Sequence, residues 1–209
     1  MSGLRGTLVT DGSSDKVLLR PLEWLLHDLG AANARIVWAE LRSLPSPPEA
    51  LGDRLQMALK MYDCDLLFVH RDAETRSIAE RQSEVEAALG SSPHPHVCVV
   101  PVRMTEAWLL FDETAIRKAA GNPGGQSPLD LPPLKRIEQE PNPKSVLHQA
   151  LRSASGLSPG RLRRFKPGAA VHGVAETIRD YSPLRELPAF SAVEQQVARY
   201  LQGGGGNAG

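Results

Sequence analysis

The first 100 residues alternate between short apolar segments and amphipathic helix patterns, and this alternation restricts the possible folds more than any other feature. Each apolar segment is followed by a stretch in which apolar residues recur every three or four positions, the spacing of one helix face. Strands and helices in this order form an open, mainly parallel sheet with helices on both faces. We therefore predict an α/β fold with a sheet of about four strands. The predicted strands are 6–10, 34–41, 65–70 and 96–102, and the predicted helices are 15–30, 47–62, 77–89 and one or two helices within 105–120.

The pattern changes after residue 120. A loop rich in Gly and Pro comes first, and no strand pattern follows it. The region predicts three helices, at 142–153, 168–181 and 185–201. We expect residues 1–120 to form the α/β core and 121–202 to form a helical extension that packs on the core as a C-terminal cap. The Gly-rich end, 203–209, is expected to be a flexible tail.

Charged residues are balanced over the whole chain but unevenly placed. There are 24 Lys and Arg against 24 Asp and Glu, yet no acidic residue lies between Glu140 and Glu176. We call the six basic residues of this interval the basic segment: Lys144, Arg152, Arg161, Arg163, Arg164 and Lys166. A basic segment favours a polyanionic partner such as DNA or RNA, because phosphate contacts release counterions. The alternative is a solvated basic loop without a partner.

Phe165 is the one aromatic residue in the interval that contains the basic segment. Base stacking is therefore weak, and any nucleic acid would be held by its backbone with low sequence specificity. Since the net charge of the chain is zero, we expect modest affinity for nucleic acid alone. A protein partner or a homodimer would raise that affinity.

Cysteine usage and hydropathy indicate a cytoplasmic protein. The two cysteines, Cys64 and Cys98, lack metal-ligand spacing and are expected to be reduced, buried thiols. No apolar run approaches the roughly 20 residues that a membrane helix needs, and the N-terminus has no secretory signal pattern. We expect no membrane contact.

Acidic residues follow two of the predicted strands. Asp11 comes after the first strand, and Asp72 and Glu74 come after the third. Ligands of open parallel sheets bind at the carboxyl ends of the strands, where the strand order reverses. If these two strands are neighbours, the three carboxylates converge on one crevice. Grouped carboxylates repel one another unless a cation neutralises them, and Mg²⁺ (or Mn²⁺) takes carboxylate, phosphate and water oxygens.

Other polar residues at the strand ends have two interpretations each. Arg71 and Arg103 can contact a phosphate, because a guanidinium forks onto phosphate oxygens, or they can neutralise the neighbouring acids. Glu106 is either a further ligand or a favourable charge at a helix start. Asp15 is either a further acidic residue of this strand end or the N-cap of the first helix. His70 is either a proton shuttle or phosphate contact, or a structural histidine at a strand end.

Two classes of phosphate-handling proteins fit the sequence poorly. Phosphatases with an aspartate nucleophile need Asp-x-Asp after the first strand, where this chain has Asp11-Gly12-Ser13. Dinucleotide binding needs Gly-x-Gly-x-x-Gly at the same place, and that motif is missing.

The strand-end motifs resemble the TOPRIM fold, which type IA and type II topoisomerases and bacterial primases share. More narrowly, the chain is similar to a family of small stand-alone TOPRIM-like proteins of unknown function. That family is related to the TOPRIM domain of overcoming-lysogenisation-defect-type nucleases. The resemblance covers about residues 4–195 and is carried by LVTDGSSDK, LLFVHRDAE, VPVRMTEAWLLFDE and NPKSVL.

This resemblance implies a Mg²⁺-dependent site that acts on phosphodiesters. Asp11 stands where the fold usually has a Glu with a general acid/base role, and it could also reach the metal. Asp72 and Glu74 stand where a metal-binding pair of aspartates is usual, so the chain departs from the pattern at Asp11 and Glu74. Arg71 and Glu106 would complete the catalytic set.

The resulting hypothesis is a metal-dependent phosphodiesterase, most simply a nuclease, with a role in prokaryotic anti-phage defence and an ATPase as its partner. The alternative hypothesis is a catalytically inactive TOPRIM-like sensor or docking subunit of an ATPase complex. In both hypotheses the basic segment would contact the nucleic acid.

Overall fold

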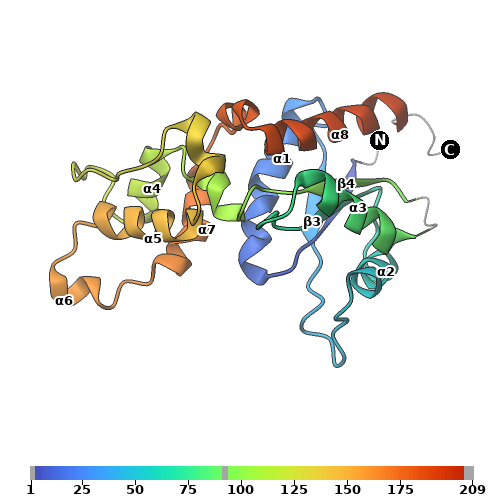
Figure 1. The fold of residues 1–209 in the computed structure, drawn as a ribbon, viewed down its shortest axis with the longest axis horizontal. Coiled ribbons are helices and arrows are strands. Elements are labelled where there is room, and N and C mark those ends of the chain that lie inside the picture. The colour runs from blue at the N-terminus through green and yellow to red at the C-terminus, as the bar shows by residue number, and fades with distance from the viewer. Residues whose placement is uncertain (1–2, 91–93, 205–209) are drawn as a thin grey trace.

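The computed structural model describes residues 3–90 and 94–204, and its centre is a four-stranded sheet (Figure 1). The strands are β1 (Arg5–Val9), β2 (Arg35–Trp38), β3 (Leu66–His70) and β4 (His96–Val99). They are hydrogen-bonded in the order β2-β1-β3-β4, and every pair is parallel. The α/β class and the parallel sheet are therefore confirmed. β1 and β3 are neighbours, which is the condition on which the predicted crevice depends.

Helices connect the strands as the sequence pattern predicts. The helix expected after the first strand is divided in two, because a six-residue 3-10 helix, η1, precedes α1 and takes up the predicted helix as far as Leu18. The capping box of Ser77 and Glu80 begins α3: the Ser77 hydroxyl accepts from the Glu80 N–H, and the Glu80 carboxylate accepts from the Ser77 N–H. The elements are η1 (Ser13–Leu18), α1 (Leu19–Asp28), α2 (Leu51–Met61), α3 (Ile78–Leu89), η2 (Thr105–Leu109) and α4 (Glu113–Ala119).

The rest of the chain is helical within the described residues. The three predicted helices are found as α5, α7 and α8, whereas η3, α6 and η4 are too short to show a periodic pattern. α7 packs against α4 and α5, and α8 lies along β4. α8 includes the first two residues of the predicted tail, and 205–209 lie outside the described residues. The elements are η3 (Leu134–Gln139), α5 (Pro143–Ala154), α6 (Pro159–Leu162), α7 (Pro167–Thr177), η4 (Ser182–Glu186) and α8 (Pro188–Gly204).

Different helices cover the two faces of the sheet. Leu8 and Phe68 belong to a core that also contains buried residues of α1, α7 and α8. Val9 and Val69, one position further along the same strands, belong to a second core with buried residues of α2 and α3. Successive side chains of a strand point to opposite faces, so this division follows from the alternation. We call these faces the α1 side and the α2 side.

A side chain of α8 pairs with the outer edge of β4. Gln196 Oε1 accepts from the Cys98 N–H at 2.9 Å, and Gln196 Nε2 donates to the Cys98 carbonyl at 3.3 Å. Backbone groups that an edge strand otherwise leaves unpaired are thereby satisfied. Burial, with a smaller effect of Glu86, raises the pKa of the Cys98 thiol to about 12, so this buried thiol is unreactive. Cys64, expected to be buried, is only half-buried.

None of the helices in the described parts of the chain has the length and apolar character needed to cross a membrane.

Candidate metal site

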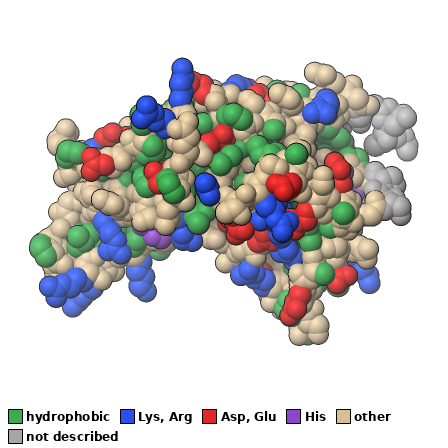
Figure 2. Space-filling model, in the orientation of Figure 1, with side chains coloured by type: hydrophobic (Ala, Val, Ile, Leu, Met, Phe, Trp, Pro, Cys, Tyr) green, Lys and Arg blue, Asp and Glu red, His purple; other side chains and the backbone are tan. Residues whose placement is uncertain are grey.

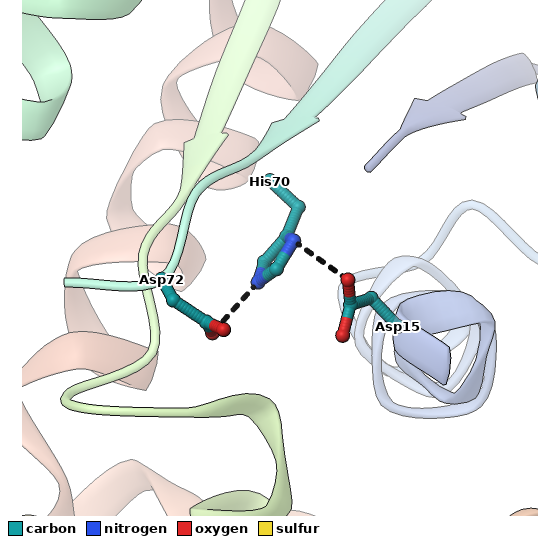
Figure 3. A group of neighbouring side chains, drawn as sticks. All are labelled: Asp15, His70 and Asp72. Atoms are coloured by element: carbon teal, nitrogen blue, oxygen red, sulfur yellow. Dashed lines mark hydrogen bonds and ion pairs between the residues drawn. The ribbon is translucent and has the colours of Figure 1, made fainter. Parts of the chain in front are cut away.

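Three potential metal ligands lie together where β1 and β3 end (Figure 3). Asp15, His70 and Asp72 each offer one ligand atom, and these atoms lie within 4.8 Å of one another. His70 Nε2 is 3.1 Å from Asp72 Oδ1, and His70 Nδ1 is 3.7 Å from Asp15 Oδ2. The imidazole therefore stands between two carboxylates, an arrangement that can hold a metal ion.

His70 and Asp72 share a side because the chain stays extended beyond β3. The backbone N–H groups of Arg71 and Ala73 still donate to carbonyls at the end of β4 and just beyond it, at 3.1 and 3.0 Å. Side chains therefore keep alternating: Ala73 belongs to the core of the α2 side, and His70 and Asp72 face the α1 side. Sequence reasoning had paired Asp72 with Glu74; the His-x-Asp spacing at the end of a strand is the signal that could have joined Asp72 to His70.

Asp15 reaches the group from the first turn of η1. Its Oδ2 accepts a hydrogen bond of 2.9 Å from the Gly12 N–H, which orients the carboxylate. A Cβ at Gly12 would lie 3.0 Å from the same oxygen, closer than most side-chain contacts. Asp15 was a candidate N-cap. In the structure Gly12 is the N-cap, Asp15 is the third residue of the helix and accepts from the Gly12 N–H, and its other partners are Ser14, Thr105 and His70.

One nitrogen of the group lacks a hydrogen-bond partner. The His70 side chain is 0% exposed, and its Nδ1 is unpaired. Leaving a buried polar atom unsatisfied costs about 1–3 kcal/mol, so such atoms call for an explanation. Imidazole nitrogens are common metal ligands, and an ion bound beside Asp15 would satisfy this one.

Thr105, from η2, closes the group on a further side. Its hydroxyl oxygen is buried and lies 3.1 Å from His70 Nε2, 3.4 Å from Asp15 Oδ1 and 3.5 Å from Asp72 Oδ1. This hydroxyl is in contact with all three candidate ligands and can donate its one proton to one of them. Sequence reasoning gave no role to Thr105, because its position depends on how η2 packs against η1.

Asp11 faces the other side of the sheet. Its Oδ1 accepts from Arg54 Nη2 at 2.8 Å and from Arg71 Nη1 at 2.9 Å, and Arg42 donates to its backbone carbonyl. Asp11 is therefore bound by arginines and lies outside the group that Asp72 joins. Alternation along β1 explains the difference, because Asp11 follows Val9 by two residues and shares its side.

Glu74 is also outside the group. Its φ of 53° turns the chain away after Ala73, so the alternation that aligns Asp72 ends there. The Glu74 carboxylate pairs with Arg81 at 3.2 Å and is 67% exposed, and Arg103 donates to its backbone carbonyl at 3.2 Å. The structure thus separates the two members of the predicted metal-binding pair.

Arg71 and Glu106 each have a charged partner. Arg71 joins Asp11 to Glu84, whose carboxylate is 2.8 Å from its Nη2. Glu106 is buried in η2, and its Oε1 lies 3.4 Å from Lys144 Nζ. One member of the basic segment therefore reaches the residue next to Thr105.

The other members of the basic segment are exposed on α5, α6 and the turn after α6. Figure 2 shows Lys and Arg side chains gathered at the end of the molecule where α6 lies. Among the described residues, none of these five side chains forms an ion pair with an acidic one. Their charges are therefore available to a polyanion. The five are Arg152, Arg161, Arg163, Arg164 and Lys166.

Comparisons with protein-family models, with curated proteins and with solved structures find no match to this chain. The resemblance to TOPRIM proteins stays a prediction, and the function is inferred from the site itself.

Proposed function

We propose that the protein is a metal-dependent phosphodiesterase, most simply a nuclease, with its ion held by Asp15, His70 and Asp72. The observation that carries the proposal is the group itself: the buried His70 ring lies between Asp15 and Asp72, and one ligand atom of each residue lies within 4.8 Å of the others. Their place supports it, because β1 and β3 are the neighbours at which the strand order reverses, and ligands of open parallel sheets bind there.

The donor set suits a divalent ion. Carboxylate oxygens favour Mg²⁺ and Mn²⁺, and an imidazole nitrogen favours transition metals. One imidazole with two carboxylates therefore shifts the expectation from Mg²⁺ toward Mn²⁺. When bound, such an ion polarises a phosphate oxygen and lowers the pKa of a water molecule.

The chain's own residues would orient the substrate and move the proton. Thr105 is in contact with the three ligands through its hydroxyl. Lys144 pairs with Glu106 and would exchange this partner for a substrate phosphate, since an ammonium binds either anion. Glu106, once released, would accept a proton from the attacking water.

The exposed members of the basic segment would bind the nucleic-acid backbone away from the reaction. Backbone contacts carry no sequence information, so the enzyme would cut with low sequence specificity. The resemblance to TOPRIM proteins supports a DNA or RNA substrate, an ATPase partner and a role in anti-phage defence.

A non-catalytic docking subunit is the second candidate. The observation that favours it is the binding of Asp11 by Arg54 and Arg71, since the resemblance assigns the acid/base role to Asp11. Both guanidinium groups donate to Oδ1 of Asp11, so this oxygen already has two hydrogen-bond partners.

A cleavage assay separates the two candidates. Single-stranded and duplex DNA and RNA are incubated with the protein in Mn²⁺, in Mg²⁺ and in EDTA. The proposal predicts cleavage that needs metal, is lost in Asp72→Ala and His70→Asn, and persists in Glu74→Gln, which removes a charge outside the group. Absence of cleavage in every condition would contradict the catalytic proposal and support the docking subunit.

A further inference from the structure

A hollow lies where β1 and β2 end. It has a volume of about 430 Å³, within the usual range of small-ligand sites, roughly 300–1,000 Å³. Its walls include the end of β1, the loop between β2 and α2, and the first turn of α2. We call it the β2 pocket. The residues that matter below are Thr10, Trp38, Arg42, Glu49 and Arg54.

Two arginines supply the β2 pocket with hydrogen-bond donors. Arg54 donates to the Thr10 carbonyl at 3.3 Å and to Asp11 at 2.8 Å, and its Nε is buried without a partner. Arg42 lies on the exposed loop and donates to the Asp11 carbonyl. A guanidinium offers five N–H donors in a planar fork, so both residues keep donors that could bind an anion. Phosphate is the anion that this geometry matches.

Trp38 gives the β2 pocket an aromatic wall that is already fixed. Its indole Nε1 donates to Thr10 Oγ1 at 2.9 Å, and Lys16 Nζ lies 5.6 Å from the ring centroid. A half-buried indole held by a hydrogen bond loses little freedom when a flat group stacks on it. Glu49 is an exposed acceptor on the pocket wall, which an amino group of a base could use.

The β2 pocket is connected to the metal-ligand group through Asp11. Arg54 and Arg71 bind the same oxygen of Asp11, and Arg71 stands between His70 and Asp72 in the chain. A chain of nucleotides that crosses the carboxyl edge between β1 and β3 would therefore meet the arginines on one side and the candidate ion on the other.

We infer that the β2 pocket binds one nucleotide, with its phosphate on Arg42 and Arg54 and its base against Trp38. Asp11 occupies the arginines in the free protein and would share them with the incoming phosphate. The identification of the ligand as a nucleotide rests on the proposed function. It adds a subsite that would hold the nucleotide next to the one that is cut.

The test is a titration of the full chain with AMP in the presence of EDTA. Binding is measured by calorimetry and by tryptophan fluorescence. Binding without metal separates this site from the metal-ligand group. We expect AMP to bind, adenosine and inorganic phosphate to bind more weakly, and the fluorescence response to disappear in Trp38→Phe. Arg54→Gln and Arg42→Gln should each weaken AMP binding about 10- to 150-fold, since a charged hydrogen bond contributes roughly 1.5–3 kcal/mol.

Arg42→Gln guards against a folding defect, because Arg42 lies on an exposed loop. Arg199→Gln is the matched control, an exposed arginine of α8 outside the β2 pocket, and should bind AMP as the wild type does. No AMP binding by the wild type, or wild-type affinity for AMP in both Arg54→Gln and Arg42→Gln, would overturn the inference. Equal affinity for AMP and inorganic phosphate would overturn the role of Trp38. If AMP binds as expected and no nucleic acid is cut, the pocket stands and the proposed activity fails.

Discussion

The two sides of the sheet's carboxyl edge carry charged residues in opposite arrangements. On the α1 side, Asp15 and Asp72 stand on either side of the His70 ring. On the α2 side, one carboxylate, Asp11, lies between the guanidinium groups of Arg54 and Arg71. The first arrangement has an excess of acceptors and can hold a cation. The second supplies its own cations and can receive an anion. The proposed phosphodiesterase would use both.

The largest expected effect is the loss of metal affinity when a candidate ligand on the α1 side is removed. Replacing His70 by Asn should weaken Mn²⁺ binding more than about 100-fold, because loss of a ligand costs more than loss of its supporting contacts, about 10–100-fold. Calorimetry with Mn²⁺ measures the change. Asp11→Asn is the control from the other side, and its affinity for Mn²⁺ should equal that of the wild type. Equal losses of Mn²⁺ affinity in His70→Asn and Asp11→Asn would contradict a metal site confined to the α1 side.

Metal should also stabilise the fold through the α1 side alone. An ion at 100 times its dissociation constant adds about 2.7 kcal/mol to the free energy of unfolding. We expect this gain in wild type and in Asp11→Asn, and its loss in EDTA and in Asp72→Asn. Urea denaturation with and without Mn²⁺ measures it. A gain that survives in Asp72→Asn would place the ion elsewhere.

On the α2 side, the expected effect is on stability in the absence of metal. Asp11→Asn should lower the free energy of unfolding by about 1–3 kcal/mol, because Arg54 and Arg71, each less than a fifth exposed, lose their charged acceptor. Glu74→Gln breaks the pair with Arg81, in which the carboxylate is exposed. It should change the free energy of unfolding by less than about 0.5 kcal/mol. Urea denaturation in EDTA compares the two. Equal effects would mean that the Asp11 pairs act as ordinary surface pairs.

The smallest expected effect concerns a histidine outside both arrangements. Burial lowers the pKa of His148 from its ordinary 6.5, as do Lys144 and Arg152, while Glu106 opposes them. A histidine whose pKa is lower in the folded state adds stability above pH 6.5, and this is lost as the pH falls through its folded pKa. Unfolding free energies should therefore fall less steeply below pH 6.5 in His148→Gln than in wild type. Identical slopes would contradict this.

The sheet was predictable because its signals are local. Strand patterns such as 65–70 and helix patterns such as 77–89 follow from periodicity, and the structure places β3 and α3 within these bounds. The short 3-10 helices were not predictable, since a few residues contain no complete period. The start of α1 moved for the same reason, because η1 occupies the first turns of the predicted helix.

The position of the candidate site at the strand ends could be predicted from the sequence, but only some of its residues could. Asp72 was identified because it follows a strand, and the adjacency of β1 and β3 was the stated condition. His70 and Asp15 were each left with a structural alternative, since a strand-end imidazole and a helix-start acid are usually structural. Glu74 was wrongly grouped with Asp72 because the sequence gives no sign of a positive φ at a non-glycine residue. That φ is what turns the chain at Glu74.

The side on which Asp11 lies could in principle have been read from the sequence. Asp11 comes two residues after Val9, the last residue of β1, and so lies on the α2 side. His70 comes two residues after Phe68 in β3 and so lies on the α1 side. What the count cannot give is the partner: Arg54 meets Asp11 only because α2 packs under the end of β1.

The most direct test of the central claim is electron spin-echo spectroscopy of bound Mn²⁺, which detects a nitrogen ligand by its nuclear modulation. We predict ¹⁴N modulation in wild type and in Asp11→Asn, and its loss in His70→Asn at metal concentrations that restore binding. Absence of ¹⁴N modulation in the wild type, or its persistence in His70→Asn, would contradict a metal site built on His70.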